Sequence, residues 1–342
     1  MVSKHSALVR TLRRQEHAIA EAVTDAFLTR HADWVTRYGE RARVAGIEDA
    51  RFHVQFLCAA IESDSPGAFE DYVRWTARVL ESRGIDRGFL RENLLQVQEA
   101  AAALLTAEQR DVVARFLSLP EGDQHAEAPS DGADAPLELP RKMFVQASLQ
   151  GDRKAALTIA TEALRTGATI EDLYSDVLQD GLYEVGHLWE SNAITVAQEH
   201  MATAVTQFVM AQLFERIERP EASRGIAVLT GVPGELHHVG ALMVADMLEA
   251  KGWRVQFLGS NLPVPAIVAA VRDAKPDVLG ISVTMLFNLH HAARLIESVR
   301  ALERPTRIVI GGAAFRVANQ WRDTGADDYA ANAKAAVALL CS

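Results

Sequence analysis

A histidine and a glycine that could bind a ligand together lie in residues 234–240, Gly-Glu-Leu-His-His-Val-Gly. The segment follows an apolar, strand-like run at 225–231 and opens an amphipathic stretch at 239–251. An imidazole in a strand-to-helix loop can reach into a flat, bulky ligand. A glycine three residues later keeps the backbone clear where that ligand approaches. His237 and Gly240 have this spacing. The alternative is that the segment is a surface loop with two histidines, which could have the same sequence.

The spacing Glu235-x-His237-x-x-Gly240 resembles the Asp-x-His-x-x-Gly loop of cobalamin-binding domains, in the Glu-first form of B12 light sensors. The resemblance implies that His237 supplies the lower ligand to cobalt in place of the nucleotide base. It also implies that Glu235 holds the other ring nitrogen, which is the support that a metal-ligating histidine generally needs. The neighbouring His238 is expected to be a surface residue at a helix start.

Strand-end residues further along the chain fit the same resemblance. Ser282 and Thr284 end a second apolar strand, and Gly311-Gly312 end a third. In cobalamin domains these positions make room for the displaced nucleotide tail beside the sheet. The alternative is that they are ordinary strand-end residues.

A second signature lies upstream, where nine residues separate Trp189 from Glu199-His200. It resembles the helical cap of adenosylcobalamin light sensors, in which these residues pack over the adenosyl group. The resemblance extends the cobalamin contacts to Val196 within this segment. Trp189 could instead be a core aromatic residue.

One position departs from that family. In the light-sensing repressors a histidine directly after the cap tryptophan captures cobalt once light has cleaved the cobalt–carbon bond. Here that position is Glu190, and a carboxylate matches the role poorly. His200, or another residue after rearrangement, is the expected substitute.

The composition narrows the class of protein. A chain of 342 residues is long enough for two or three domains, and 49% of its residues are apolar, which allows substantial cores. A formal net charge of −10 without a compact Lys/Arg cluster argues against a general nucleic-acid surface. Cys58 and Cys341 have no partner motif, which indicates a reducing compartment. With no signal-peptide core and no apolar run of membrane length, we expect a soluble, cytoplasmic protein.

The chain divides by pattern into four parts. Residues 1–119 carry apolar residues at helical spacing and predict five or six helices in one bundle or globin-like domain. Residues 120–136 are acidic and rich in Gly, Pro, Ser and Ala, which predicts a linker. Residues 137–219 predict a four-helix cap, with capping boxes starting at Thr169 and Thr195.

From residue 220 to 342 the period changes. Apolar strands alternate with helical stretches, at 225–230, 254–259, 277–284, 307–311 and 328–330. Strands that are apolar on both faces predict a parallel sheet of the flavodoxin or Rossmann-like α/β type. The His237 loop would then lie at the carboxyl end of the first strand, where open sheets bind ligands.

The cobalamin resemblance is compatible with three functions. A mutase would need a barrel domain, for which the chain has no segment. A methyl-transfer corrinoid protein uses the domain and a helical cap to carry methyl groups between partner enzymes, and its N-terminal domain would be a docking or dimerisation bundle. The cap signature points instead to adenosylcobalamin photosensing. Residues 1–119 differ from the basic helix-turn-helix domain of the light-sensing repressors.

The overall architecture resembles the photocobilins, sensors that join a cobalamin photoreceptor module to a helical domain that binds biliverdin. The resemblance implies a bilin in the N-terminal domain, and such a ligand needs aromatic stacking, a polar group near its nitrogens and cations for two propionates. The candidates are Tyr38, Trp75 and His53 for the first two needs and Arg41, Arg43, Arg51 or Arg74 for the last. Cys58 could attach a vinyl group but is expected to be packed.

The sequence pattern predicts no separate effector domain in this chain. A photosensor of this kind would signal by a light-dependent change in self-association or in contact with a separate effector protein. Neither direct nucleic-acid binding nor membrane binding is expected, and no catalytic residues are predicted.

Overall fold

The computed structural model describes residues 4–118, 136–217, 220–318 and 321–342. These residues form two compact units, the first within 4–118 and the second made of residues 136–217, 220–316 and 321–342. The predicted acidic linker, except for Pro136, lies outside the described residues.

The N-terminal unit is helical, as predicted, with seven helices between residues 6 and 117 in the part that the structure describes. The helix beyond the five or six predicted lies before Gln15, which separates it from the next helix. The helices are α1 (Ser6–Arg14), α2 (Glu16–Arg30), α3 (Ala32–Tyr38), α4 (Arg41–Glu62), α5 (Pro66–Ser82), α6 (Arg87–Ala102) and α7 (Ala107–Leu117).

Helices α2, α4 and α6 form the centre of this unit. Their apolar positions recur at helical spacing, so each buries one stripe against the others. Ile19, Leu57 and Leu94 are among the residues buried in the shared core. Asp86 caps α6 through Gly88 N–H, and Thr106 forms the predicted capping box with Gln109.

The second unit begins with the helices of the cap. They are α8 (Glu138–Leu149), α9 (Arg153–Arg165), α10 (Ile170–Asp172), the π-helical segment η1 (Leu173–Gln179), α11 (Asp180–Glu190) and α12 (Val196–Phe214). Both predicted capping boxes are present, at Thr169 and at Thr195. The π-helical segment η1 interrupts the α-helical geometry between α10 and α11, and π-helical turns inside α-helices often occur at functional sites.

The rest of the unit is the predicted parallel α/β domain. Its sheet has five strands in the order β2-β1-β3-β4-β5, all parallel in the described residues. The strands are β1 (Ile226–Gly231), β2 (Arg254–Phe257), β3 (Val278–Ser282), β4 (Arg307–Gly311) and β5 (Asp328–Ala330). The intervening elements are α13 (Val239–Ala250), α14 (Val264–Ala274), η2 (Leu286–Asn288), α15 (Leu289–Arg300), α16 (Ala314–Ala318), η3 (Trp321–Thr324) and α17 (Ala333–Cys341).

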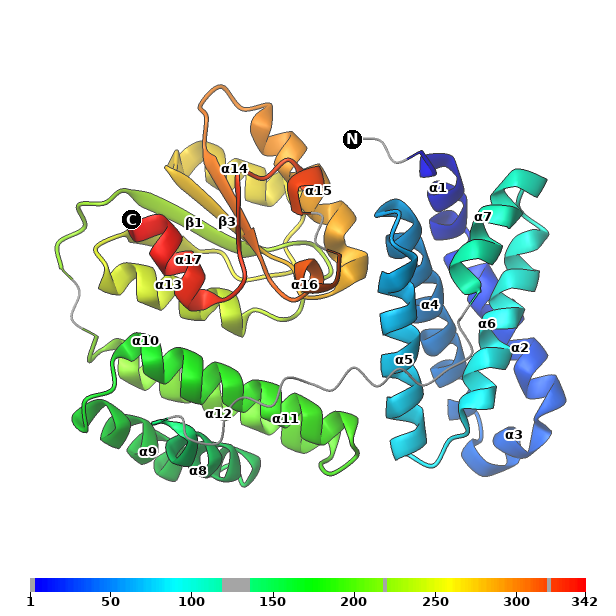
Figure 1. Ribbon diagram of the computed structural model, residues 1–342, viewed down its shortest axis with the longest axis horizontal. Helices are drawn as coiled ribbons and strands as arrows, with labels where there is room; N and C mark the ends of the chain where they lie inside the picture. Colours follow the sequence, from blue (N-terminus) through cyan, green and yellow to red (C-terminus); the bar gives the residue numbers. More distant parts are fainter. Residues whose placement is uncertain (1–3, 119–135, 218–219, 319–320) are drawn as a thin grey trace. The chain divides into compact units, whose positions relative to one another are not determined.

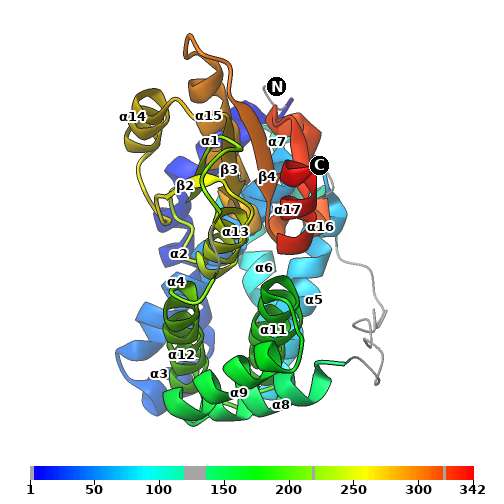
Figure 2. The same cartoon turned by 90° about the vertical axis from the view of Figure 1, so that its left-hand side faces the viewer.

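The helices cover both faces of the sheet. Helices α13 and α17 pack on one face and α14 and α15 on the other, as Figure 1 shows. The cap lies on the face that α13 and α17 cover, in both views (Figure 1, Figure 2). Cap and sheet share one hydrophobic core, which includes Tyr174 and Val205 of the cap and Met247 of α13.

Polar contacts also join the cap to the sheet domain. The buried hydroxyl of Tyr174 donates to Asp246 at 2.9 Å. Lys334 at the start of α17 pairs with Asp176 at 2.8 Å and with Asp172 at 3.1 Å. The cap is therefore docked on the sheet domain.

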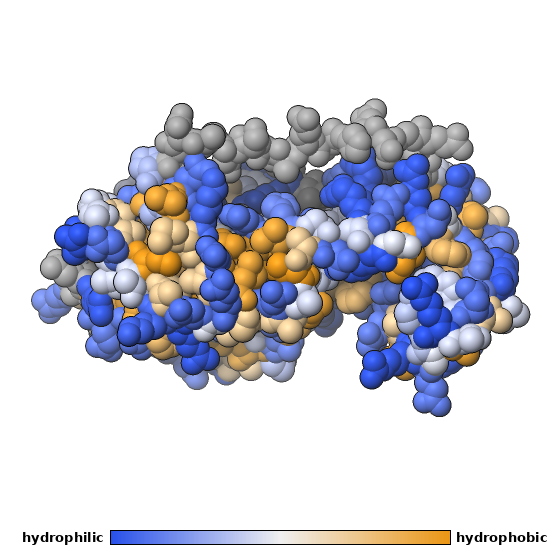
Figure 3. Space-filling model, turned by 90° about the horizontal axis from the view of Figure 1, so that it is seen from below, coloured by the Kyte–Doolittle hydropathy of each residue, from blue (hydrophilic) through white to orange (hydrophobic). Residues whose placement is uncertain are grey.

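The outward surface of the cap is mixed in character. Figure 3 shows apolar side chains among charged ones on the lower face of this unit, at the left of the view. On α8, Leu139 and Met143 are exposed one turn apart. No helix among the described residues is long and apolar enough to cross a membrane.

Candidate functional site

The loop after β1 holds the side chain of Glu235 against His237. Glu235 has no exposed surface. Its Oε1 lies 2.6 Å from Nδ1 of His237 and accepts the backbone N–H of His237 at 3.0 Å. An ionised carboxylate can only accept, so Nδ1 carries the proton and donates it. The lone pair is thereby assigned to Nε2, which is the state of a histidine prepared to bind a metal.

The other oxygen of Glu235 is held by the loop after β3. Its Oε2 accepts backbone N–H groups from Thr284 at 2.8 Å and from Met285 at 3.1 Å. The side-chain amide of the buried Asn288 donates to the same oxygen at 3.3 Å. These bonds fix the carboxylate and, through it, the ring of His237.

The hydrogen bonds decide the charge of this pair. Burial by itself raises the pKa of Glu235, but the bonds from His237, Met285 and Thr284 outweigh it and lower the pKa to about 2. The carboxylate therefore stays ionised at neutral pH. Its hydrogen bond to His237 raises the pKa of that imidazole, with a smaller contribution from the charge of Glu199. A proton and a metal ion would compete for Nε2.

Glycines shape the backbone around the imidazole. Gly234 has a φ of +78°, which favours glycine, and its N–H donates to Asn261 at 2.9 Å. A Cβ at Gly240 would meet no atom outside its own helix within 4 Å, so this position faces open space. The predicted role of Gly240, clearing an approach, is compatible with this geometry.

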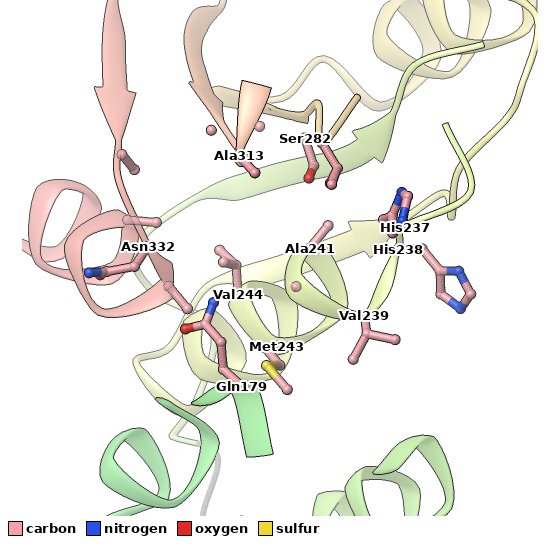
Figure 4. Close-up of a pocket in the computed structure, with 18 of the residues that line it drawn as sticks. Gln179, His237, His238, Val239, Ala241, Met243, Val244, Ser282, Ala313 and Asn332 are labelled. Carbon is pink, nitrogen blue, oxygen red and sulfur yellow. The ribbon is translucent and has the colours of Figure 1, made fainter. Parts of the chain in front are cut away.

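His237 and Gly240 open into a cavity of about 570 Å³ between the cap, α13 and the carboxyl ends of the strands. In Figure 4, Ser282 and Ala313 lie at the strand ends, Ala241 and Val244 on α13, and Gln179 points up from the cap. Of the predicted cobalamin residues, those that line the cavity are Glu199, His200, His237, Gly240, Ser282, Thr284, Gly311 and Gly312.

The part of the cavity beside the sheet is apolar. Leu229 of β1, Val309 of β4, Val244 of α13 and Leu340 of α17 are among its lining residues. A glycine in β3 allows close packing here. A Cβ at Gly280 would lie 2.2 Å from Cδ2 of Leu229. The sequence did not predict this packing role of Gly280, because a glycine inside an apolar strand does not indicate which residue it will face.

The pair at the end of β4 is constrained by the backbone. Gly312 has a φ of +108°, and its Cβ would lie 2.2 Å from the carbonyl oxygen of Val283. At Gly311 a Cβ would lie 3.0 Å from the carbonyl oxygen of Ala330. The two glycines line the apolar compartment where the sequence predicted a nucleotide tail.

The cap supplies the opposite wall. Glu199 and His200 line the cavity from the first turn of α12 and are hydrogen-bonded to each other. Trp189 and Val196 do not line it. Trp189 is partly buried near the end of α11, and Val196 is 55% exposed. Glu190 does not line the cavity either, and its carboxylate lies 3.5 Å from Nδ1 of His187.

Several cavity residues carried no signal in the sequence. Gln179 and Tyr183 reach it from η1 and α11, Arg316 reaches it from α16, and Asn332 reaches it from the loop after β5. His238 also lines the cavity. It is half-buried at the start of α13 and not the surface residue that was predicted, because it faces the cavity and its Nε2 lies 2.7 Å from Gln207 of the cap.

The residues predicted to contact a bilin lie in two places in the N-terminal unit. The buried His53 has Nδ1 at 2.7 Å from the Tyr72 hydroxyl, and the Trp75 ring is 6.4 Å from the Tyr72 ring. Burial lowers the pKa of His53 to about 4, so the imidazole is neutral at pH 7.

Tyr38 belongs to a separate aromatic cluster and lies 5.5 Å from the ring of Trp34. Arg41 is exposed at the start of α4. The expectation that Cys58 is packed is confirmed, because it is fully buried and burial raises the pKa of its thiol to about 12. Such a thiol is a poor nucleophile.

Comparison with known proteins agrees with the site. Residues 225–338 match a family described as B12 binding domain, and residues 141–214 match a second family with the same description. Both matches lie in the second unit. Among the described residues, no group of three or more His, Cys, Asp or Glu side chains is arranged to hold a metal ion by itself.

Relatives of two kinds share this part of the chain. The dimethylamine corrinoid protein 3 of Methanosarcina acetivorans is 29% identical over 190 residues, which cover 54% of this chain and 88% of that protein. The HTH-type transcriptional repressor CarH of Myxococcus xanthus is 34% identical over 145 residues, which cover 42% of this chain and 48% of the repressor.

A solved structure shares the fold. The monomethylamine corrinoid protein of Methanosarcina barkeri aligns with a TM-score of 0.53 at 23% identity, covering 60% of this chain and 98% of that chain. Residues 141–214 and 225–338 are therefore B12-binding domains, homologous to corrinoid proteins and to the repressor CarH.

Proposed function

We propose that this protein is a light sensor that binds adenosylcobalamin with the nucleotide base displaced and His237 in its place. The observation that carries the proposal is one cavity lined by an oriented imidazole from the sheet domain and by Glu199 and His200 from the cap. When bound, adenosylcobalamin supplies a cobalt–carbon bond that light can break.

The residues of the sheet domain fit a corrinoid. Glu235 fixes the tautomer of His237, and 59% of the His237 side chain is exposed. The open space at Gly240 leaves the approach to the ring unobstructed. The apolar compartment between α13 and the sheet has the character needed to take up a displaced aromatic base.

The residues of the cap are suited to sense the upper face of the ligand. Glu199 and His200 stand at the positive end of α12, and Gln179 comes from the π-helical segment. Two bonds at the rim join the cap to the sheet domain, Gln207 to His238 and Arg316 to Tyr183. A change at the upper face could therefore alter how the cap is held, and we propose this as the origin of the signal.

Glu190 stands where the light-sensing repressors have a capturing histidine, and it does not line the cavity. We therefore assign it no role in the light state. His200, which lines the cavity, is the histidine of the cap that we propose for that role.

We propose further that the N-terminal unit binds biliverdin. The support is a buried polar pair, His53 and Tyr72, surrounded by flat aromatic surface. Phe56 stacks on Tyr72 with ring centroids 3.9 Å apart, and Trp75 lies beside them. A neutral imidazole among aromatic rings suits the nitrogens of a conjugated, flat ligand.

A second candidate function has support from the relatives. Corrinoid proteins of methylamine metabolism match 88% of their own length here. In that reading the chain is a corrinoid carrier of a methyltransferase system, and the N-terminal unit is a docking or dimerisation bundle.

Ligand preference and light response separate the two functions. Apoprotein is offered adenosylcobalamin and methylcobalamin in competition, and the elution volume of each complex is measured in the dark and after green light. The light sensor prefers the adenosyl form and changes its elution volume on illumination. Preference for the methyl form, with an elution volume indifferent to light, would favour the carrier.

A further inference from the structure

The rim of the cavity carries a single permanent cation. Among the described residues that line the cavity, Arg316 is the only lysine or arginine, and Glu199 is the only carboxylate. Arg316 stands on α16, one turn beyond Gly312 at the mouth of the apolar compartment. Nothing in the sequence motif required a cation at this place.

Arg316 is held at the rim by neutral partners. One guanidinium nitrogen donates to the Tyr183 hydroxyl at 3.2 Å and to the Ala331 carbonyl oxygen at 3.4 Å. The guanidinium carbon lies 5.5 Å from the centre of the Tyr183 ring. These contacts orient the group without neutralising it, and a guanidinium has five N–H donors. As far as the described residues go, the charge and most of the donors therefore remain available to a ligand.

The compartment behind this cation is suited to a neutral group. Leu229, Val244, Val309 and Leu340 line its interior. A displaced nucleotide base could enter there, but the phosphodiester that links it to the corrin carries a negative charge. Burying that charge among aliphatic side chains would be costly unless it is paired. The phosphodiester must therefore stay near the mouth, where Arg316 stands.

We infer that Arg316 binds the phosphodiester of the nucleotide tail and so makes the site selective for corrinoids that carry this tail. The inference rests on the proposed binding of cobalamin with its base displaced. It gives Arg316 a task distinct from that of His237, because His237 holds the metal whether or not a tail is present. Guanidinium groups suit this task, since they can bind phosphate through two parallel hydrogen bonds.

The test compares two ligands that differ in the tail. Aquocobalamin has the phosphodiester, whereas aquocobinamide lacks both phosphate and base. Dissociation constants of both are measured by visible absorption titration of the full chain, for wild type, Arg316→Gln and Arg316→Lys. Arg322→Gln is the matched control, because Arg322 stacks on Trp321 at 4.4 Å and does not line the cavity.

We expect Arg316→Gln to weaken aquocobalamin binding about tenfold, the size of one lost charge-assisted contact, and to leave cobinamide within about twofold. Arg316→Lys should fall between, and the control should match wild type. Raising the salt concentration should weaken aquocobalamin binding by wild type more than by Arg316→Gln.

Equal losses for the two ligands would show that Arg316 only secures the cap through Tyr183, and would overturn the inference. So would an unchanged dissociation constant for aquocobalamin. A wild-type chain that binds neither ligand would instead contradict the proposed function. Melting curves identify any variant that has lost its fold, and the lysine variant then carries the comparison.

Discussion

The fully buried carboxylate of Glu235 holds Nδ1 of His237 at 2.6 Å while its other oxygen is fixed by the loop after β3. This places a charged group with no exposed surface directly behind an imidazole that is 59% exposed. The pair therefore combines a rigid support with an accessible ligand atom. Mutation of a support of this kind typically lowers metal affinity by about 10- to 100-fold.

The first prediction concerns the pH dependence of ligand binding. Glu235 raises the pKa of His237, and only the neutral imidazole can bind cobalt. Below the raised pKa of the apoprotein, a proton must leave Nε2 before cobalt binds, so the affinity for cobalamin falls as the pH is lowered past this pKa. In Glu235→Gln that pKa returns towards its ordinary value of about 6.5, so the fall in affinity should begin at lower pH.

Dissociation constants of cobalamin measured at a series of pH values between about 5 and 8 would locate where the affinity begins to fall in each protein. Overall affinity should also fall in Glu235→Gln, by about 10- to 100-fold. Asn288→Ala is a useful companion, because it removes only the donor at 3.3 Å and leaves the carboxylate charge in place. A fall in affinity that begins at the same pH in wild type and Glu235→Gln would disprove the charge coupling.

The second prediction separates two glycines by what they do. Gly240→Ala introduces a methyl group into open space, so we expect a melting temperature near that of wild type and a large loss of cobalamin affinity. Gly312→Ala places a methyl group 2.2 Å from a backbone oxygen at a φ of +108°, so we expect destabilisation of about 1–3 kcal/mol.

Calorimetry and ligand titration on the two variants measure both effects. If Gly240→Ala bound cobalamin as tightly as wild type, the corrin would not approach the site over this residue. If Gly312→Ala melted like wild type, the strain argument at the end of β4 would be wrong.

The local parts of the site were predictable from the sequence, and the long-range contacts were not. The Glu235–His237 pair is set by a two-residue spacing within one loop, and the strands by runs of apolar residues. The bond from Asn288 to Glu235 spans 53 residues and depends on β1 lying beside β3. A local pattern of residues cannot predict such a contact.

The cap shows the same limit. Spacing predicted that Trp189, Glu199 and His200 would act together, yet only the last two line the cavity. The π-helical segment before α11 adds an extra residue per turn, which changes the faces that α11 presents and brings Gln179 and Tyr183 to the cavity. A helical projection that assumes a regular period cannot anticipate that change.

The third prediction concerns the N-terminal unit. If biliverdin binds beside the His53–Tyr72 pair, adding it to apoprotein should produce structured red absorption. His53→Ala or Trp75→Ala should reduce the affinity at least about tenfold, since each removes a contact to the ligand. Tyr38→Ala tests the separate aromatic cluster, which should contribute little.

Serum albumin provides the control for nonspecific uptake. An absorption change no different from that with albumin, and unaltered by His53→Ala and Trp75→Ala, would leave the docking or dimerisation bundle as the role of this unit.

The most direct test of the central claim is the electron paramagnetic resonance spectrum of the reduced cob(II)alamin complex, made with protein that contains ¹⁵N-labelled histidine. A nitrogen bound beneath cobalt splits each line, into three for ¹⁴N and into two for ¹⁵N. With His237 as the lower ligand, the labelled protein should show doublets and the unlabelled protein triplets. His237→Ala should lose the doublet pattern. Triplets that persist in the labelled protein would mean that the ligand's own base still occupies cobalt, which would contradict the account.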